Sequence, residues 1–183
     1  MHLPWLARRV YQGSELWDLS LVDPDNRRPV DYEQRQQWLD ELMTSRSDDP
    51  WPELWQNRYD ARIKLWLLNR LLIERNQQPD LFAKGQYIPL TIEGTYSQHV
   101  LAFARQYQQS WYFVAVPLGL ASLCSDQQTD SVSIDWKDTR LVLPDDAPAH
   151  WHHCLVKAKG KADSSIAVNE LFPFLPLAIV KLE

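Results

Sequence analysis

The fold class of this chain is decided by two neighbouring runs of sequence, His99-Val100-Leu101-Ala102-Phe103-Ala104-Arg105 and Trp111-Tyr112-Phe113-Val114-Ala115-Val116. Both are rich in the aliphatic and aromatic residues that favour strands. Similar short runs, broken by turn-forming residues, continue from Gly85 onward, and no helical run of any length is expected there. Many short strands at regular spacing predict an antiparallel β-sandwich or an open barrel. The other expected strands are Tyr87-Ile88, Thr91-Ile92, Val132 to Trp136, Thr139 to Leu143, Cys154 to Lys157, Ser165 to Val168 and Leu177 to Leu182.

Two helices are expected before this β-rich part. Asp31, followed three residues later by Gln34, is typical of a helix start, and apolar residues then recur at helical spacing as far as Thr44. A second, longer helix is expected from the prolines at 50 and 52 to about Arg75, because proline is tolerated in a first turn. The sequence therefore predicts an α+β chain, with a loop and two-helix leader over residues 1–84 and an all-β domain over residues 85–183.

The second expected helix is apolar on more than one side. Ile63, Trp66, Leu67 and Leu71 share one side, whereas Leu65, Leu68 and Leu72 share another. A helix that is apolar over most of its circumference is normally buried on two sides. We therefore expect residues 60–75 to contact a partner, which is either a second copy of the chain or a barrel domain.

The composition excludes several classes of function. The formal net charge of −5 argues against duplex nucleic acid or an anionic membrane surface as a partner, because both select a basic face. Only two cysteines occur, Cys124 and Cys154, so a soluble protein of the reducing cytoplasm is the expected class. No secretory signal and no run of membrane-spanning length is seen.

The side chains best suited to binding lie in the leader between Val10 and Tyr32. This stretch combines aromatic residues, an amide, carboxylates and an arginine pair on a loop whose path is restricted by prolines. Such groups suit a sugar, which offers hydroxyls and apolar ring faces. Most of the nine tryptophans are expected to pack internally, and Trp17 is the candidate for stacking on a sugar. The candidate substrate-binding residues are Tyr11, Gln12, Glu15, Trp17, Asp23, Asp25, Asn26, Arg27, Arg28 and Tyr32.

The chain resembles malto-oligosyltrehalose synthase, a family of the α-amylase superfamily that rearranges the reducing end of a malto-oligosaccharide into a trehalose linkage. Four stretches carry the resemblance: Tyr11 to Leu16, Asp23 to Tyr32, Leu81 to Leu90 and His99 to Arg105, and a fifth, Trp136 to Pro144, agrees. The resemblance implies a catalytic barrel followed by an all-β carboxyl-terminal domain. Residues 1–84 would then be a remnant of the end of the barrel domain.

The resemblance also implies that the reacting groups are missing from this sequence. The aspartate nucleophile, the glutamate acid/base and the second aspartate of the family would precede Met1, so no catalytic residue is expected here. Leu6 to Arg9 departs from the family's approach to its eighth strand, and Leu118-Gly119 stands where the family tends to place an arginine. We expect a carboxyl-terminal fragment that is inactive alone and binds malto-oligosaccharide weakly or not at all in isolation.

Other readings of the same residues stay open or are set aside. Arg27 and Arg28 have carboxylates on both sides, so an ion-pair lattice that stiffens the loop is the alternative to substrate contact. Asp23 and Asp25 lie on a loop with no preceding strand to position them, so we do not expect them to act as the acid and nucleophile of a glycosidase. In His150-Trp151-His152-His153-Cys154 at most two ligands can converge if the run is a strand, so no metal is expected. The five glycines form no phosphate-binding pattern, and no cofactor is expected.

Overall fold

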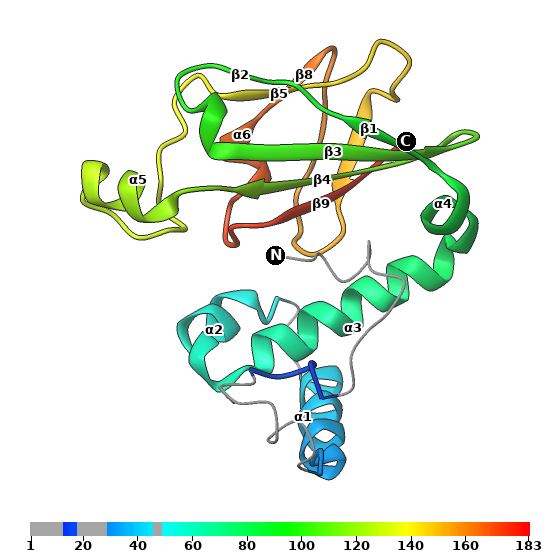
Figure 1. The fold of residues 1–183 in the computed structure, drawn as a ribbon, viewed down its shortest axis with the longest axis vertical. Coiled ribbons are helices and arrows are strands. Elements are labelled where there is room, and N and C mark those ends of the chain that lie inside the picture. Colours follow the sequence, from blue (N-terminus) through cyan, green and yellow to red (C-terminus); the bar gives the residue numbers. More distant parts are fainter. Residues whose placement is uncertain (1–12, 18–28, 46–48) are drawn as a thin grey trace. The chain divides into compact units, whose positions relative to one another are not determined.

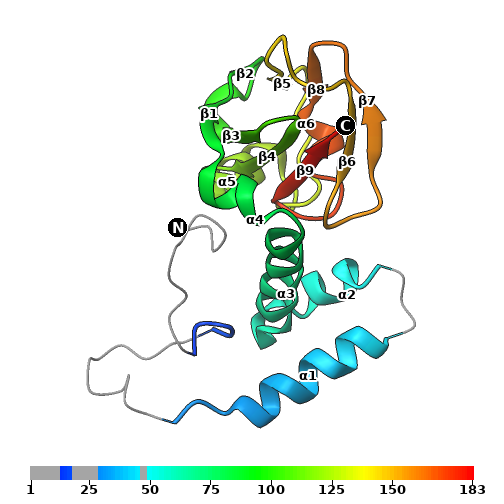
Figure 2. The same ribbon diagram turned by 90° about the vertical axis from the view of Figure 1, so that its right-hand side faces the viewer.

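The computed structural model describes residues 13–17, 29–45 and 49–183, and the chain forms two compact units, Met1–Gln77 and Gln78–Glu183 (Figures 1 and 2). The first unit is helical and the second is rich in strands, so the expected α+β class is confirmed. The division falls before the expected 84/85 boundary, because helix α4 (Pro79–Lys84) clusters with the strands. Each unit is described below by itself.

The second unit is built on two antiparallel sheets (Figure 1). The six-stranded sheet contains, in spatial order, β1 (Gln86–Pro89), β3 (Val100–Tyr107), β4 (Ser110–Pro117), β9 (Ala178–Leu182), β6 (His150–His153) and β7 (Lys159–Lys161). The three-stranded sheet contains β2 (Ile92–Glu93), β5 (Arg140–Val142) and β8 (Ser165–Ala167). Figure 2 shows β7 at one edge of the larger sheet and β1 at the other.

The hairpin of β3 and β4 forms the centre of the larger sheet. Its register runs from Val100 opposite Pro117 to Tyr107 opposite Ser110. Side chains alternate across a strand, so every second residue of each run faces the smaller sheet. Ala104 and Phe113, which lie opposite each other, are 1% and 0% exposed and belong to the core that also contains Leu141 of β5. The two runs that favoured a β-sandwich thus supply its interior.

The outer face of the larger sheet is also apolar. Phe103, Tyr112 and Ile179 are each at most 3% exposed and do not belong to the core between the sheets. Helix α4 packs on this face, where the rings of Phe82 and Tyr112 meet edge to face with centroids 5.5 Å apart. The Arg105 guanidinium donates to the Phe82 carbonyl at 3.2 Å. The sheet is therefore buried on both faces over its central strands.

Two expectations for this unit are wrong. Helices α5 (Leu120–Gln127) and α6 (Val168–Leu171) form where none of any length was expected. No strand forms over Val132 to Trp136 or over Cys154 to Lys157. Side chains take the place of a strand ladder in both segments: Gln127 pairs with the backbone of Asp135, and His153 Nδ1 accepts from the Leu155 and Val156 amides. Backbone groups satisfied in this way need no neighbouring strand.

The Trp136 to Pro144 stretch holds the start of β5 against a turn. Asp138 accepts from the Thr95 amide at 3.0 Å and from the Thr95 hydroxyl at 2.7 Å, and these hydrogen bonds lower the pKa of the Asp138 carboxyl. The Thr139 side chain, 1% exposed, accepts from the Tyr96 amide at 3.1 Å. Gly94 begins the turn with φ of +101°. These contacts make the stretch part of the scaffold.

The helical unit starts as expected. Helix α1 (Tyr32–Thr44) is capped by Asp31, which accepts from the Gln34 amide at 2.9 Å. The expected second helix is instead interrupted, because α2 (Trp51–Gln56) and the 3-10 turn η2 (Arg58–Asp60) precede α3 (Arg62–Gln77).

The interruption has a local cause in the side chains around it. Ala61 adopts a left-handed conformation with φ of 72°. Asp60 then accepts from the Arg62 amide at 3.0 Å, which caps the new helix. Partial burial acts to raise the pKa of Asp60, but the side-chain hydrogen bond, the backbone hydrogen bond and the charge of Arg62 together keep that pKa below its usual value.

The buried residues of helix α3 come from both of its expected apolar sides, Ile63 and Leu71 from one and Leu65 from the other. Ile63, Leu65 and Leu71 are buried, whereas Leu72 is 42% exposed and Trp66, Leu67 and Leu68 are half-buried. No helix among residues 13–17, 29–45 and 49–183 is long and apolar enough to cross a membrane.

Candidate functional site

Three of the expected substrate-binding residues lie in the part of the chain that the structure describes: Glu15, Trp17 and Tyr32. They come from the short turn at 13–17 and from the first residue of α1. The remaining candidates, Tyr11, Gln12, Asp23, Asp25, Asn26, Arg27 and Arg28, lie outside the described residues. The candidate site is therefore built here from its flanking segments.

Arg35 joins the two segments that carry these residues. Its Nε donates to Glu15 Oε2 at 3.2 Å, and its Nη2 donates to the Gly13 carbonyl at 3.3 Å. Its Nη1 donates to the Asp31 carbonyl at 2.7 Å. The Arg35 and Glu15 side chains are only 15% and 23% exposed, so the ion pair is partly shielded from water. One guanidinium thus connects the 13–17 turn to the amino end of α1.

Close packing of the backbone reinforces this connection. Gly13 has φ of +83°, and a Cβ built on it would lie 3.0 Å from Val30 Cγ2. Only glycine adopts this conformation readily. Residues on both sides of the 18–28 segment are therefore held next to each other.

Trp17 is fixed by two further contacts from the same unit. Its indole Nε1 donates to the Arg58 carbonyl at 2.8 Å. Lys64 donates to the Leu16 carbonyl at 2.9 Å and places its ammonium 5.1 Å from the centroid of the Trp17 ring. The indole nevertheless stays 50% exposed. Trp17 is therefore an exposed aromatic ring that is fixed in position, with the Lys64 ammonium on one side.

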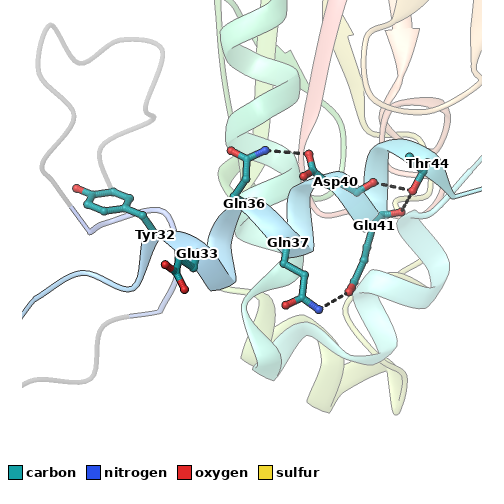
Figure 3. A pocket seen from close by; sticks show the side chains of 7 residues that line it. All are labelled: Tyr32, Glu33, Gln36, Gln37, Asp40, Glu41 and Thr44. Carbon is teal, nitrogen blue, oxygen red and sulfur yellow. Dashed lines mark hydrogen bonds between the residues drawn. The ribbon is translucent and has the colours of Figure 1, made fainter.

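Tyr32 lies at one end of a shallow, open pocket on α1 of about 740 Å³ (Figure 3). The Tyr32 ring is 52% exposed. The other lining side chains pair along the helix, Gln36 with Asp40 at 2.8 Å and Gln37 with Glu41 at 2.9 Å. Such pairs one helical turn apart stabilise an isolated helix, and a single convex helix face encloses little of a ligand. We assign this surface mainly to helix stability.

The histidine run does not assemble a metal site within the described residues. Trp151 and His153 of β6 are buried, whereas His150 is exposed. No group of three or more His, Cys, Asp and Glu side chains with metal-binding geometry occurs over 13–17, 29–45 and 49–183. His153 serves the backbone, as described above.

Sequence reasoning missed Arg35, Arg58 and Lys64. Arg35 follows the capping Asp31 by one helical turn, and that spacing was the available signal for a residue that reaches back beyond the helix start. Arg58 and Lys64 act on residues more than 40 positions away, as the Arg58 to Trp17 separation of 41 shows. Contacts at such separations depend on how the helices pack.

Replacing Arg35 by glutamine is expected to release the 13–17 turn. The change removes the ion pair and at least one charged hydrogen bond, so the free energy of opening this turn should fall by about 2 kcal/mol. Hydrogen exchange of a peptide covering 13–17 should speed up roughly thirtyfold. Lys84→Gln breaks an exposed ion pair with Asp80 in the other unit and serves as the charge-matched control. Equal exchange in wild type and Arg35→Gln would show that Arg35 does not hold the turn.

The chain is similar in sequence to known proteins. It is 35% identical over 171 residues to the Mycobacterium tuberculosis protein assigned as a maltooligosyl trehalose synthase, in two strains. The match covers 93% of this chain and 18% of that protein, so the chain spans less than a fifth of the length of these relatives. No family model matches the chain.

The structural comparisons agree with the sequence relationship. The maltooligosyltrehalose synthase of Arthrobacter ramosus aligns over 93% of this chain and 19% of its own, with 27% identity and a TM-score of 0.69, and a mutant of it gives 0.70. A further crystal structure of a maltooligosyl trehalose synthase, 24% identical, shares the fold with a TM-score of 0.58. The chain is a homologue of the malto-oligosyltrehalose synthases and corresponds to their carboxyl-terminal region.

Proposed function

We propose that this chain serves as the carboxyl-terminal part of a malto-oligosyltrehalose synthase. In that role it supports the rearrangement of a malto-oligosaccharide end into a trehalose linkage, while the reacting carboxylates come from a barrel domain. The observation that carries the proposal is the bracing of the 13–17 turn by Arg35 and Lys64. A segment held by charged hydrogen bonds on a helical support has the rigidity that substrate positioning needs. The presence of only two cysteines fits a reducing cytoplasm as its compartment.

Each part of the chain has a role in this proposal. The loop around Asp23, Asn26 and Arg27 lines one side of a saccharide cleft, with its flanks anchored at Gly13 and Val30. The β-sandwich serves as a rigid support for the barrel domain. Helix α3, with Leu72 exposed and several half-buried leucines, is the surface that meets the barrel or a second copy of the chain.

Co-expression with a barrel domain from a related synthase tests this function. The chain alone should leave maltopentaose unchanged, and the mixed preparation should yield a non-reducing trehalose-type product. A barrel prepared without the chain is the control. Turnover of maltopentaose by the purified chain alone would contradict the proposal, as would a barrel that is equally active without it.

The half-exposed Trp17 favours a second candidate, a module that binds malto-oligosaccharide without reacting it. Isothermal titration with maltopentaose discriminates between the two. Millimolar or tighter binding that is lost in Arg27→Ala supports the module, and no heat supports a chain that acts only when joined to a barrel.

A further inference from the structure

The interruption between α2 and α3 brings aromatic and cationic side chains together in the helical unit. Here the chain leaves helical geometry through η2 and the left-handed Ala61. A left-handed conformation is unfavourable for alanine, so the turn persists because surrounding contacts stabilise it. One of these contacts is the hydrogen bond of 2.8 Å from the Trp17 indole to the Arg58 carbonyl.

The Arg58 side chain packs against two aromatic rings, those of Trp55 and Tyr59. Its guanidinium carbon lies 5.0 Å from the centroid of the Trp55 ring and 4.9 Å from the centroid of the Tyr59 ring. Its Nη1 also donates to the Trp55 carbonyl at 2.9 Å, which limits its movement. The backbone of Arg58 therefore holds Trp17 while its side chain supports Tyr59, the next residue along the chain.

Trp17 and Tyr59 share an arrangement that is uncommon for exposed aromatic residues. Trp17 is 50% exposed and Tyr59 is 83% exposed. Each ring has a cation over it, Lys64 for Trp17 and Arg58 for Tyr59. Cation–π contacts hold a ring in place while leaving much of its surface in water. Two large aromatic rings are thus held in place without being buried, and Arg58 contacts both of them, Trp17 through its carbonyl and Tyr59 through its guanidinium.

A glucan chain matches this pair chemically. A glucose ring offers an apolar C–H face and a rim of hydroxyls, which suits an exposed aromatic face bordered by charged donors and acceptors. A protein partner would instead favour a continuous apolar patch, whereas Lys64 and Arg58 place a cation over each of these rings.

We propose that Trp17 and Tyr59 form a surface that binds an α-glucan chain, with Arg58 and Lys64 as positioning residues. This rests on the proposed role in malto-oligosaccharide chemistry and adds Tyr59, Arg58 and Lys64 to it. The surface holds the sugar chain and takes no part in bond rearrangement.

Native electrophoresis of the full chain through gels containing amylopectin tests the inference, because repeated glucan sites amplify weak binding. The wild-type protein should be retarded, and Tyr59→Ala and Trp17→Ala should each raise the apparent Kd roughly tenfold. Tyr59 is almost fully exposed, so its variant should retain the fold. Tyr87→Ala, which removes a tyrosine of equal exposure to Trp17 from the other unit, is the matched control.

The positioning residues have their own readout. Lys64→Met keeps the apolar stem and removes the charge, and it should weaken retardation about threefold and broaden the Trp17 indole resonance, whereas Lys64→Arg should restore both. Unretarded wild type, or loss of retardation in Tyr87→Ala but not in Tyr59→Ala, overturns the inference. Neither result affects product formation with the barrel domain, so failure here is distinguishable from failure of the proposed function.

Discussion

Replacing Gly94 by alanine is expected to destabilise the β-rich unit by about 3 kcal/mol, because two costs coincide at this position. The backbone has φ of +101°, which side-chain-bearing residues rarely adopt. A Cβ there would also lie 2.7 Å from both the Asp138 carbonyl oxygen and Thr139 Cα. Both atoms belong to the backbone that leads directly into β5, so they cannot rotate away as a side chain could. Relief requires the turn to separate from Asp138 and Thr139.

Urea denaturation followed by circular dichroism measures this loss. Gly119→Ala is the control, because Gly119 has φ of +62° and its nearest contact is a side-chain atom of His99 at 3.3 Å. The control should lose only about 1 kcal/mol, the cost of a left-handed residue. Equal losses in the two variants would show that the contact with β5 is unimportant.

Acid is expected to destabilise the same unit through His153. Burial lowers the pKa of His153 from 6.5 to about 4, and the charge of neighbouring His152 adds to this, while the carbonyls of Leu171 and Leu177 oppose it. The folded state therefore favours the neutral ring. Stability is fully present above the unfolded pKa of 6.5 and falls as the pH drops towards 4, by about 3 kcal/mol in total.

The hydrogen bonds around His153 explain why the folded protein favours the neutral ring. Nδ1 accepts from the Leu155 amide at 3.1 Å and the Val156 amide at 3.4 Å, so neutral His153 carries its proton on Nε2. Nε2 has no hydrogen-bond partner among the described residues. A second proton on Nδ1 would face two amide donors inside the protein.

His153→Asn tests this explanation, since its side-chain oxygen can accept from the same amides and does not titrate. Urea midpoints should fall between pH 6.5 and 4 for the wild type, and much less for the variant. Parallel curves for the two proteins would mean that another group causes the acid sensitivity.

Much of the β-rich unit was predictable because its pattern is local. The strand-forming residues in His99 to Arg105 and Trp111 to Val116 predict two strands, and β3 and β4 confirm them. The start of α1 was equally predictable, because Asp31 accepts a hydrogen bond from the amide of Gln34, only three residues away. In both cases the determining contacts lie within a few residues or follow a simple period.

The errors lie where distant side chains replace backbone pairing. Val132 to Trp136 has strand-forming residues, yet Asn169 accepts from the Trp136 amide at 3.0 Å and no strand forms. The turn before α3 was missed for a similar reason, because Trp17 stabilises it from a separation of 41 residues. Propensity is a weak guide when tertiary contacts of this kind compete with it.

By itself the sequence determined the α+β class, the antiparallel sandwich, the cap of α1 and the relationship to the malto-oligosyltrehalose synthases, because periodicity, capping and motif are properties of neighbouring residues. Only the tertiary structure decided that Arg35 joins the 13–17 turn to α1 and that Arg58 contacts both Trp17 and Tyr59. Those arrangements depend on how segments far apart in the chain pack together. The spacing of residues in the sequence does not predict which side chains are buried or charged where such segments contact each other.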